Sequence, residues 1–173
     1  DAQRAGKRIA AWAEPYIFEE GAAMPVQVTG GTRDVAVRET GRGKYENAVV
    51  IGDFVGIADE PVDVGGGGRG PDPYEYVGVG LGARTSMTLR MYADRKKFPL
   101  DQARVTLRHE KIHAEDCEAC ETADGRVDQI DVEIHLEGDL TEEQRQRIYE
   151  IAERCPVHQT LKSEVSLKSR LTE

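Results

Sequence analysis

The sequence lacks the features that mark several large classes of protein. No apolar run approaches the ~20 residues that a membrane-spanning helix needs, and no signal peptide is visible, so we expect a cytoplasmic protein without membrane contact. The net charge of −9 argues against a nucleic-acid partner, which would require a basic patch. Three cysteines are an odd number, so a purely structural disulfide framework is not expected.

Aromatic side chains are also scarce, with one Trp and three Phe in 173 residues. Aliphatic residues, alanine and methionine must therefore fill the core of a chain whose length suits one domain. Residues 1–18 have helical spacing, and we assign 1–24 to an N-terminal helical segment and 25–173 to the main domain.

Turns and alternating patterns outline the main domain. Short alternating runs over residues 25–58 predict an antiparallel meander. The four glycines at 65–68 predict a flexible loop, and a phosphate cradle is disfavoured because no Lys-Ser or Lys-Thr pair follows them. Further strands are predicted at 103–114, 127–138 and 164–171.

Two helices are predicted between these strands. The first runs from Pro73 to Lys96, with apolar or small residues at three- and four-residue spacing. Its three glycines, each of which costs about 1 kcal/mol relative to Ala, predict close backbone packing against another helix or a second copy. The second helix begins with a capping box formed by Thr141 and Gln144. The order of the elements predicts the α+β class.

Cys155 is the best candidate for a reactive thiol. It precedes Pro156, which suits the first position of a short helix, so Cys155 can cap that helix and gain a lowered pKa. Arg154 and His158 lie nearby in the sequence. The alternative is a buried, inert cysteine.

Arg84 is a long cation in a helical stretch of small residues. It either extends toward solvent or pairs with a carboxylate such as Glu75, or it places a positive charge near Cys155. A guanidinium cannot itself attack a peroxide at neutral pH.

The segment 113–120 contains His113, Cys117 and Cys120. A zinc site would need a fourth ligand, and His109 is the obvious candidate. A redox pair and two loop thiols without a special role are the other interpretations. We predict no bound metal and no cofactor.

Several motifs together resemble the OsmC/Ohr family. They are ADEP at 58–61, GPDPYEYVGVGLGA, TSMTLRMYADRK, HAEDCEAC, LEGDLTEEQR and CPVH. The resemblance implies antiparallel sheets wrapped around two central helices in an intertwined homodimer, with each active site at the subunit interface. Some OsmC-like domains follow an α/β-hydrolase, and residues 1–18 resemble the last helix of such a domain.

The resemblance also implies a reaction. In the family, a cysteine on the first long helix reduces an organic hydroperoxide and becomes a sulfenic acid, the second cysteine captures it as a disulfide, and a dithiol reductant resets the pair. Cys155 matches the second cysteine, whereas Arg84 occupies the position of the first. Glu75 lies one residue from the place of a family glutamate, and Arg33, with Arg38 as the fallback, matches the family's mobile arginine.

Three interpretations follow from this resemblance. The chain is an OsmC-like protein whose peroxidase activity is lost or reduced and which serves as a binding or dimerisation module for a hydroperoxide or another small apolar ligand. Alternatively, Cys155 reacts and Cys117 or Cys120 resolves it, which requires Cα atoms within about 7 Å. In the third interpretation, the chain is the regulatory or assembly part of a hydrolase fusion.

Overall fold

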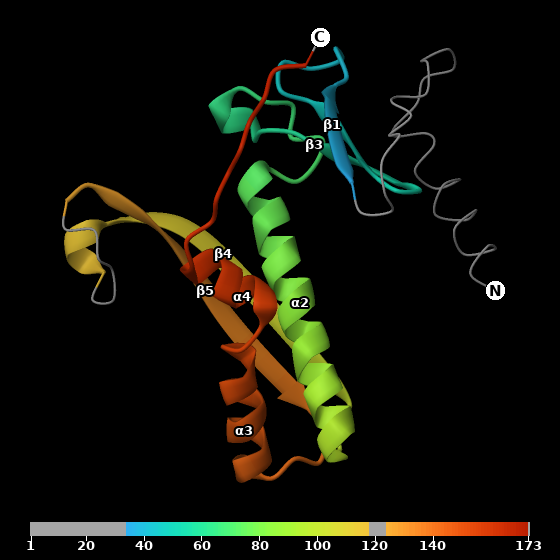
Figure 1. The fold of residues 1–173 in the computed structure, drawn as a ribbon, viewed down its shortest axis with the longest axis vertical. Helices are drawn as coiled ribbons and strands as arrows, with labels where there is room; N and C mark the ends of the chain where they lie inside the picture. Colours follow the sequence, from blue (N-terminus) through green and yellow to red (C-terminus); the bar gives the residue numbers. More distant parts are fainter. Residues whose placement is uncertain (1–33, 118–123, 173) are drawn as a thin grey trace. The chain divides into compact units, whose positions relative to one another are not determined.

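The computed structural model describes residues 34–117 and 124–172 (Figure 1). The chain divides into two compact units with a boundary between Pro73 and Tyr74. The predicted segment 1–24 and the predicted strand near residue 25 lie outside the described residues, so the division at residue 25 stays a prediction. Within the described part of the chain, no helix is long and apolar enough to cross a membrane.

The first unit contains the predicted meander. Strands β1 (Val35–Glu39), β2 (Asn47–Ile51) and β3 (Phe54–Ala58) form an antiparallel sheet in the order β1-β2-β3. The turn between β2 and β3 contains Gly52, whose φ of 58° is a conformation that glycine adopts without strain. The alternating sequence pattern therefore identified this sheet correctly.

The glycine-rich loop after β3 is organised by one buried carboxylate. Asp59, 2% exposed, accepts hydrogen bonds from the backbone N–H groups of Glu60, Gly67 and Arg69 at 2.9, 3.0 and 3.2 Å. A Cβ at Gly66 would lie 1.9 Å from the carbonyl oxygen of Glu60. The loop also contains a short 3-10 helix, η1 (Val62–Val64). The sequence predicted only a flexible loop, whereas the glycines here permit close backbone approach.

A second buried carboxylate connects this loop to the β1–β2 turn. Glu46 is 1% exposed, and its Oε1 accepts hydrogen bonds from Thr40 Oγ1 and Arg42 Nε, both at 2.7 Å. Its Oε2 lies 3.1 Å from Arg69 Nε, close enough for an ion pair but without the alignment of a hydrogen bond. Glu46 is therefore neutralised by two arginines and has a structural role.

The second unit is built on a long hairpin. Strands β4 (Gln102–His113) and β5 (Arg126–Glu137) pair antiparallel along their full length. Figure 1 shows α2 (Pro73–Lys96) lying along this hairpin, with α3 (Glu142–Ala152) and the short α4 (Pro156–Lys162) beside it. The bounds of α2 are those predicted, and the capping box of α3 is present. The core of this unit consists of Leu89, Ala93, Leu100, Ile148 and Ala152. The predicted α+β class is confirmed.

One sequence-based expectation is wrong in the second unit, and another is met only in part. The predicted strand at 164–171 is absent, because these residues form no ladder with any described strand. Among the described residues, Gly82 has the close packing expected of the helix glycines: a Cβ there would lie 2.6 Å from Leu107 Cδ1. Apart from the backbone of α2 itself, no described residue of the chain lies within 4 Å of a Cβ at Gly78 or Gly80, so their packing against a second copy stays a prediction.

Candidate functional site around Cys155

Cys155 lies at the start of α4, in the position that the sequence predicted. It is the N-cap residue, with Pro156 at the first helical position, and its exposed fraction is 0%. Its backbone carbonyl accepts a hydrogen bond from the N–H of Gln159 at 2.9 Å. Among the described residues, it is the free cysteine.

One turn of α2 packs against the sulfur. The hydroxyls of Thr85 and Thr88 both lie against Cys155, and Thr85 is itself 2% exposed. The single hydroxyl proton of Thr88 is donated to the backbone carbonyl of Arg84 at 2.8 Å. Thr85 is therefore the threonine whose proton can be donated to the sulfur.

The environment of the sulfur favours the thiolate. Burial is the largest influence and raises the pKa of Cys155, but the N–H groups of His158 and Val157, together with Thr85 and Thr88, oppose it, and the net pKa lies below its ordinary value. The Cys155 side chain accepts no capping hydrogen bond of standard geometry. The N–H groups of His158 and Val157 therefore affect its pKa through the orientation of their dipoles. Cys155 is thus an enclosed thiol whose surroundings lower its pKa.

Arg84 lies on the same turn of α2 as the two threonines and is half-buried. Glu75 is in the first turn of α2, nine residues earlier. Nine residues correspond to about half a turn around the axis and about 13 Å along it. The expected pairing of Arg84 with Glu75 is therefore wrong, because the helix places the two side chains on opposite sides.

The remaining candidate arginines, Arg33 and Arg38, are not among the described residues of the second unit. Arg33 lies outside the described residues. Arg38 is an exposed residue of β1 in the first unit. The roles expected for Arg33 and Glu75 stay predictions.

Two of the residues proposed for a zinc site, Cys117 and His109, have other partners. Cys117 is disulfide-bonded. His109 stacks on Tyr74 with 4.2 Å between ring centroids, and its Nε2 lies 2.8 Å from Asp128 Oδ1. No group of three potential metal ligands occurs among residues 34–117 and 124–172. The pKa of Asp128 is lowered, chiefly by its hydrogen bond with Lys111.

Cys117 is also badly placed to resolve Cys155 within one chain. Leu107 of β4 lies beside Gly82, one turn from Thr85. From there β4 continues for six residues, roughly 20 Å, before the 3-10 helix η2 (Ala114–Asp116) and Cys117. Figure 1 shows this end of the hairpin well away from α4. Disulfide partners need Cα atoms within about 7 Å.

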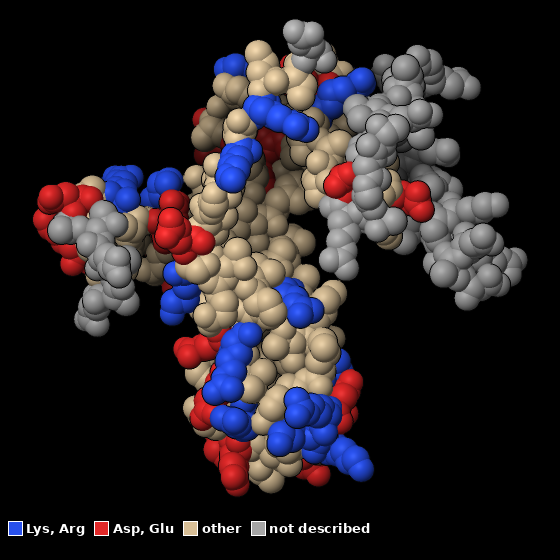
Figure 2. Space-filling view, viewed as in Figure 1, with Lys and Arg blue, Asp and Glu red and all other residues tan. Residues whose placement is uncertain are grey.

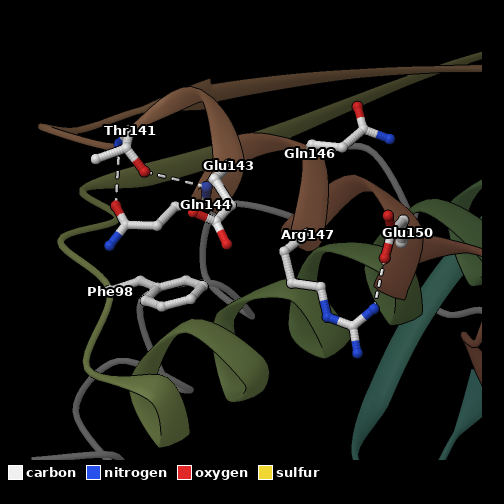
Figure 3. A pocket seen from close by; sticks show the side chains of 7 residues that line it. All are labelled: Phe98, Thr141, Glu143, Gln144, Gln146, Arg147 and Glu150. Carbon is white, nitrogen blue, oxygen red and sulfur yellow. Dashed lines mark hydrogen bonds and ion pairs between the residues drawn. The ribbon is translucent and has the colours of Figure 1, made fainter.

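A hollow of about 710 Å³ lies elsewhere on the second unit. Figure 3 shows Phe98 facing the first turn of α3, with Arg147 joined to Glu150. Its lining contains no cysteine or histidine, and Arg147 also donates to Tyr92. The hollow is therefore separate from the thiol and presents no thiol or imidazole group. Its lining residues are Phe98, Thr141, Glu143, Gln144, Gln146, Arg147 and Glu150.

The fold is of the α+β class, and its candidate site is a cysteine that caps the N-terminus of α4 and packs against α2. The family model described as OsmC-like protein matches residues 65–170, and the chain belongs to this family. No curated protein matches the sequence significantly.

Solved structures of the family share the fold. An organic hydroperoxide resistance protein OsmC from Legionella pneumophila is 16% identical, with a TM-score of 0.56 over 77% of this chain and 92% of that one. OhrB, the organic hydroperoxide resistance protein of Bacillus subtilis, is 18% identical, with a TM-score of 0.55 over 79% and 95%. An OsmC-like protein from Mycoplasma pneumoniae is 16% identical, with a TM-score of 0.57 over 75% and 86%.

The sequence did not identify Thr85 and Thr88 as site residues. Their three- and four-residue spacing with other apolar or small residues predicts only a packing stripe of the helix, and Thr85 is buried on it. The available signal was a polar residue at a core position immediately after Arg84.

Proposed function

We propose that this chain is an OsmC-fold protein in which the two-cysteine reduction of organic hydroperoxides is lost or strongly reduced. It acts instead as a module that binds a small apolar ligand or that mediates dimerisation. The observation that carries the proposal is the packing of the Thr85–Thr88 turn on Cys155. Position 84 lies on the same turn of α2 as these threonines, and the residue there is an arginine.

The chemistry explains why this substitution matters. In the family cycle, a thiolate sulfur attacks the O–O bond and takes one oxygen, and the leaving alkoxide is protonated to an alcohol. A second thiolate then attacks the sulfenic sulfur, which releases water and leaves a disulfide for a dithiol to reduce. A guanidinium has no lone pair available for the first step, so Arg84 and Cys155 cannot complete the cycle.

The proposal includes a homodimer and a cytoplasmic location. The dimer is supported by apolar side chains that remain exposed on α2, such as Val79 at 61% and Met87 at 57%, since such surfaces commonly mark interfaces. The cytoplasmic location rests on the sequence-based expectation alone, because the second unit contains both the free thiol of Cys155 and a disulfide-bonded Cys117. As an alternative, the chain is the C-terminal part of a hydrolase fusion, which the resemblance of residues 1–18 to a hydrolase helix supports.

One observation favours a different function, in which Cys155 itself is the nucleophile. Its pKa is lowered, and a thiolate is the reactive form. Complete burial opposes this role, because a hydroperoxide must reach the sulfur.

Turnover of cumene hydroperoxide with a dithiol reductant separates these functions. We expect no turnover by the wild-type protein and a gain of turnover in Arg84→Cys that is abolished by adding Cys155→Ser. Rapid turnover by the wild-type protein, lost in Cys155→Ser, would instead establish the one-cysteine enzyme.

A further inference from the structure

Three helices meet at Cys155, and one of them is held much less firmly than the other two. Helix α2 is anchored in the core of the second unit through Leu89 and Ala93, and α3 through Ile148 and Ala152. Helix α4 has seven residues, and none of them is buried. Helices of this length are not stable on their own in water. The enclosure of Cys155 therefore depends on a weakly anchored element.

The side-chain hydrogen bonds of α4 join residues that are close in the sequence. The hydroxyl of Thr160 donates to the carbonyl of Pro156 at 3.0 Å, and the side-chain amide of Gln159 donates to the carbonyl of Glu153 at 2.6 Å. Because Glu153 directly follows α3, Gln159 ties α4 to the end of α3. Residues 163–172 are exposed and form neither a helix nor a strand, so they do not extend α4.

We propose that α4 is a lid over Cys155, which opens by local unfolding while α2, α3 and the β4–β5 hairpin stay folded. In the closed state, the sulfur faces Thr85 and Thr88 of α2 and the N–H groups of Val157 and His158 of α4. Opening removes the α4 side of this enclosure, so a small molecule can reach the sulfur. Elements with few buried apolar contacts are those that open most readily.

The lid controls access to the site of the proposed function, but it does not require any turnover of hydroperoxide. It gives a completely enclosed thiol a route to slow reaction with small molecules. Figure 2 shows mostly residues without charge over the middle of α2 and over α4. An uncharged reagent can therefore approach this surface without strong electrostatic repulsion, and iodoacetamide is such a reagent.

Alkylation of the full chain by excess iodoacetamide tests the lid, with the modification at Cys155 quantified by mass spectrometry. We expect Cys155 in the wild-type protein to react about tenfold or more slowly than in the urea-unfolded chain, because only the open fraction reacts. Below the global unfolding transition, the rate should depend only weakly on the urea concentration, because opening of α4 exposes little surface.

Two variants of α4 should open the lid. Gln159→Ala removes the hydrogen bond to Glu153 and should raise the alkylation rate by about threefold or more. Thr160→Pro breaks the helix and should raise the rate by about tenfold or more. Thermal unfolding shows whether each variant keeps its fold. The matched control is Gln146→Ala, which removes an exposed glutamine of α3 and should react at the rate of the wild-type protein.

Three results would overturn the lid. The first is a rate that rises with urea as steeply as global unfolding does, since the whole unit would then have to unfold. The second is an unchanged rate in both folded α4 variants. The third is a rate that falls as the protein concentration rises, because dissociation of a second copy would then expose Cys155. Hydroperoxide turnover by Arg84→Cys is a separate readout, so the two proposals can fail independently.

Discussion

Two buried acceptors in this molecule are surrounded by donors in similar ways but have different consequences. Asp59 in the first unit accepts three backbone N–H groups, and Cys155 in the second unit faces two backbone N–H groups and two hydroxyls. The Asp59 carboxylate fixes a loop. The thiol titrates, so the same kind of environment changes its reactivity as well as its structure.

Removal of the Asp59 carboxylate should have the largest effect on the free energy of unfolding. Asp59→Ala leaves three backbone N–H groups without their acceptor, and each unsatisfied buried group costs about 1–3 kcal/mol. We expect the free energy of unfolding to fall by about 3 kcal/mol or more in chemical denaturation. The control is Asp63→Ala in the same loop, an exposed side chain whose loss should change stability by less than about 0.5 kcal/mol. Similar stabilities of the two variants would contradict the role given to Asp59.

One glycine in each unit extends the comparison between the two units. Gly66→Ala would place a Cβ 1.9 Å from the carbonyl oxygen of Glu60, so we expect a loss of about 2 kcal/mol or more. Gly80→Ala places a Cβ in open space within α2 and should stabilise the chain by up to about 1 kcal/mol, because Ala favours a helix. Thermal unfolding of both variants gives the comparison, and destabilisation by Gly80→Ala would show that this side of α2 is covered in solution.

The next effect concerns the titration of Cys155. Thr85→Val removes a hydroxyl that faces the sulfur, so the pKa of Cys155 should rise. Thr88→Val is the matched control and should raise it less, because the Thr88 proton is donated to the Arg84 carbonyl. Thiolate absorbance near 240 nm, measured against Cys155→Ser over a pH series, reports both. Equal shifts in the two variants would refute the assignment of Thr85 as the donor.

The smallest effect is the dependence of stability on pH. A thiol whose pKa is lowered on folding binds fewer protons in the folded than in the unfolded state between the lowered value and its ordinary value near 9. The free energy of unfolding of the wild-type protein relative to Cys155→Ser should therefore rise with pH through this window and be lost as the pH falls through the folded pKa. A difference that is constant with pH would mean that the environment leaves the thiol unperturbed.

Local patterns explain how much of the fold was predictable. The bounds of α2, the capping box of α3 and the position of Cys155 at the start of α4 all followed from short-range chemistry: helical spacing, a side-chain cap and a proline at the first helical position. The strand predicted at 164–171 failed because a strand requires a partner, and an alternating pattern does not supply one.

The candidate site was only partly predictable for the same reason. The sequence indicated Cys155 and drew attention to Arg84, but the contact between Cys155 and Thr85 joins residues 70 positions apart. The pairing of Arg84 with Glu75 is wrong because a separation of nine residues in a helix points the two side chains in opposite directions. The ordered glycine loop depended on Asp59, whose three hydrogen bonds are tertiary contacts.

The central claim is that the reactive sulfur is missing from position 84. Counting free thiols in the reduced protein before and after one equivalent of cumene hydroperoxide tests it most directly. We predict that the wild-type protein loses no Cys155 thiol, whereas Arg84→Cys loses the two thiols at positions 84 and 155 as a disulfide. Consumption of Cys155 in the wild-type protein would contradict the account.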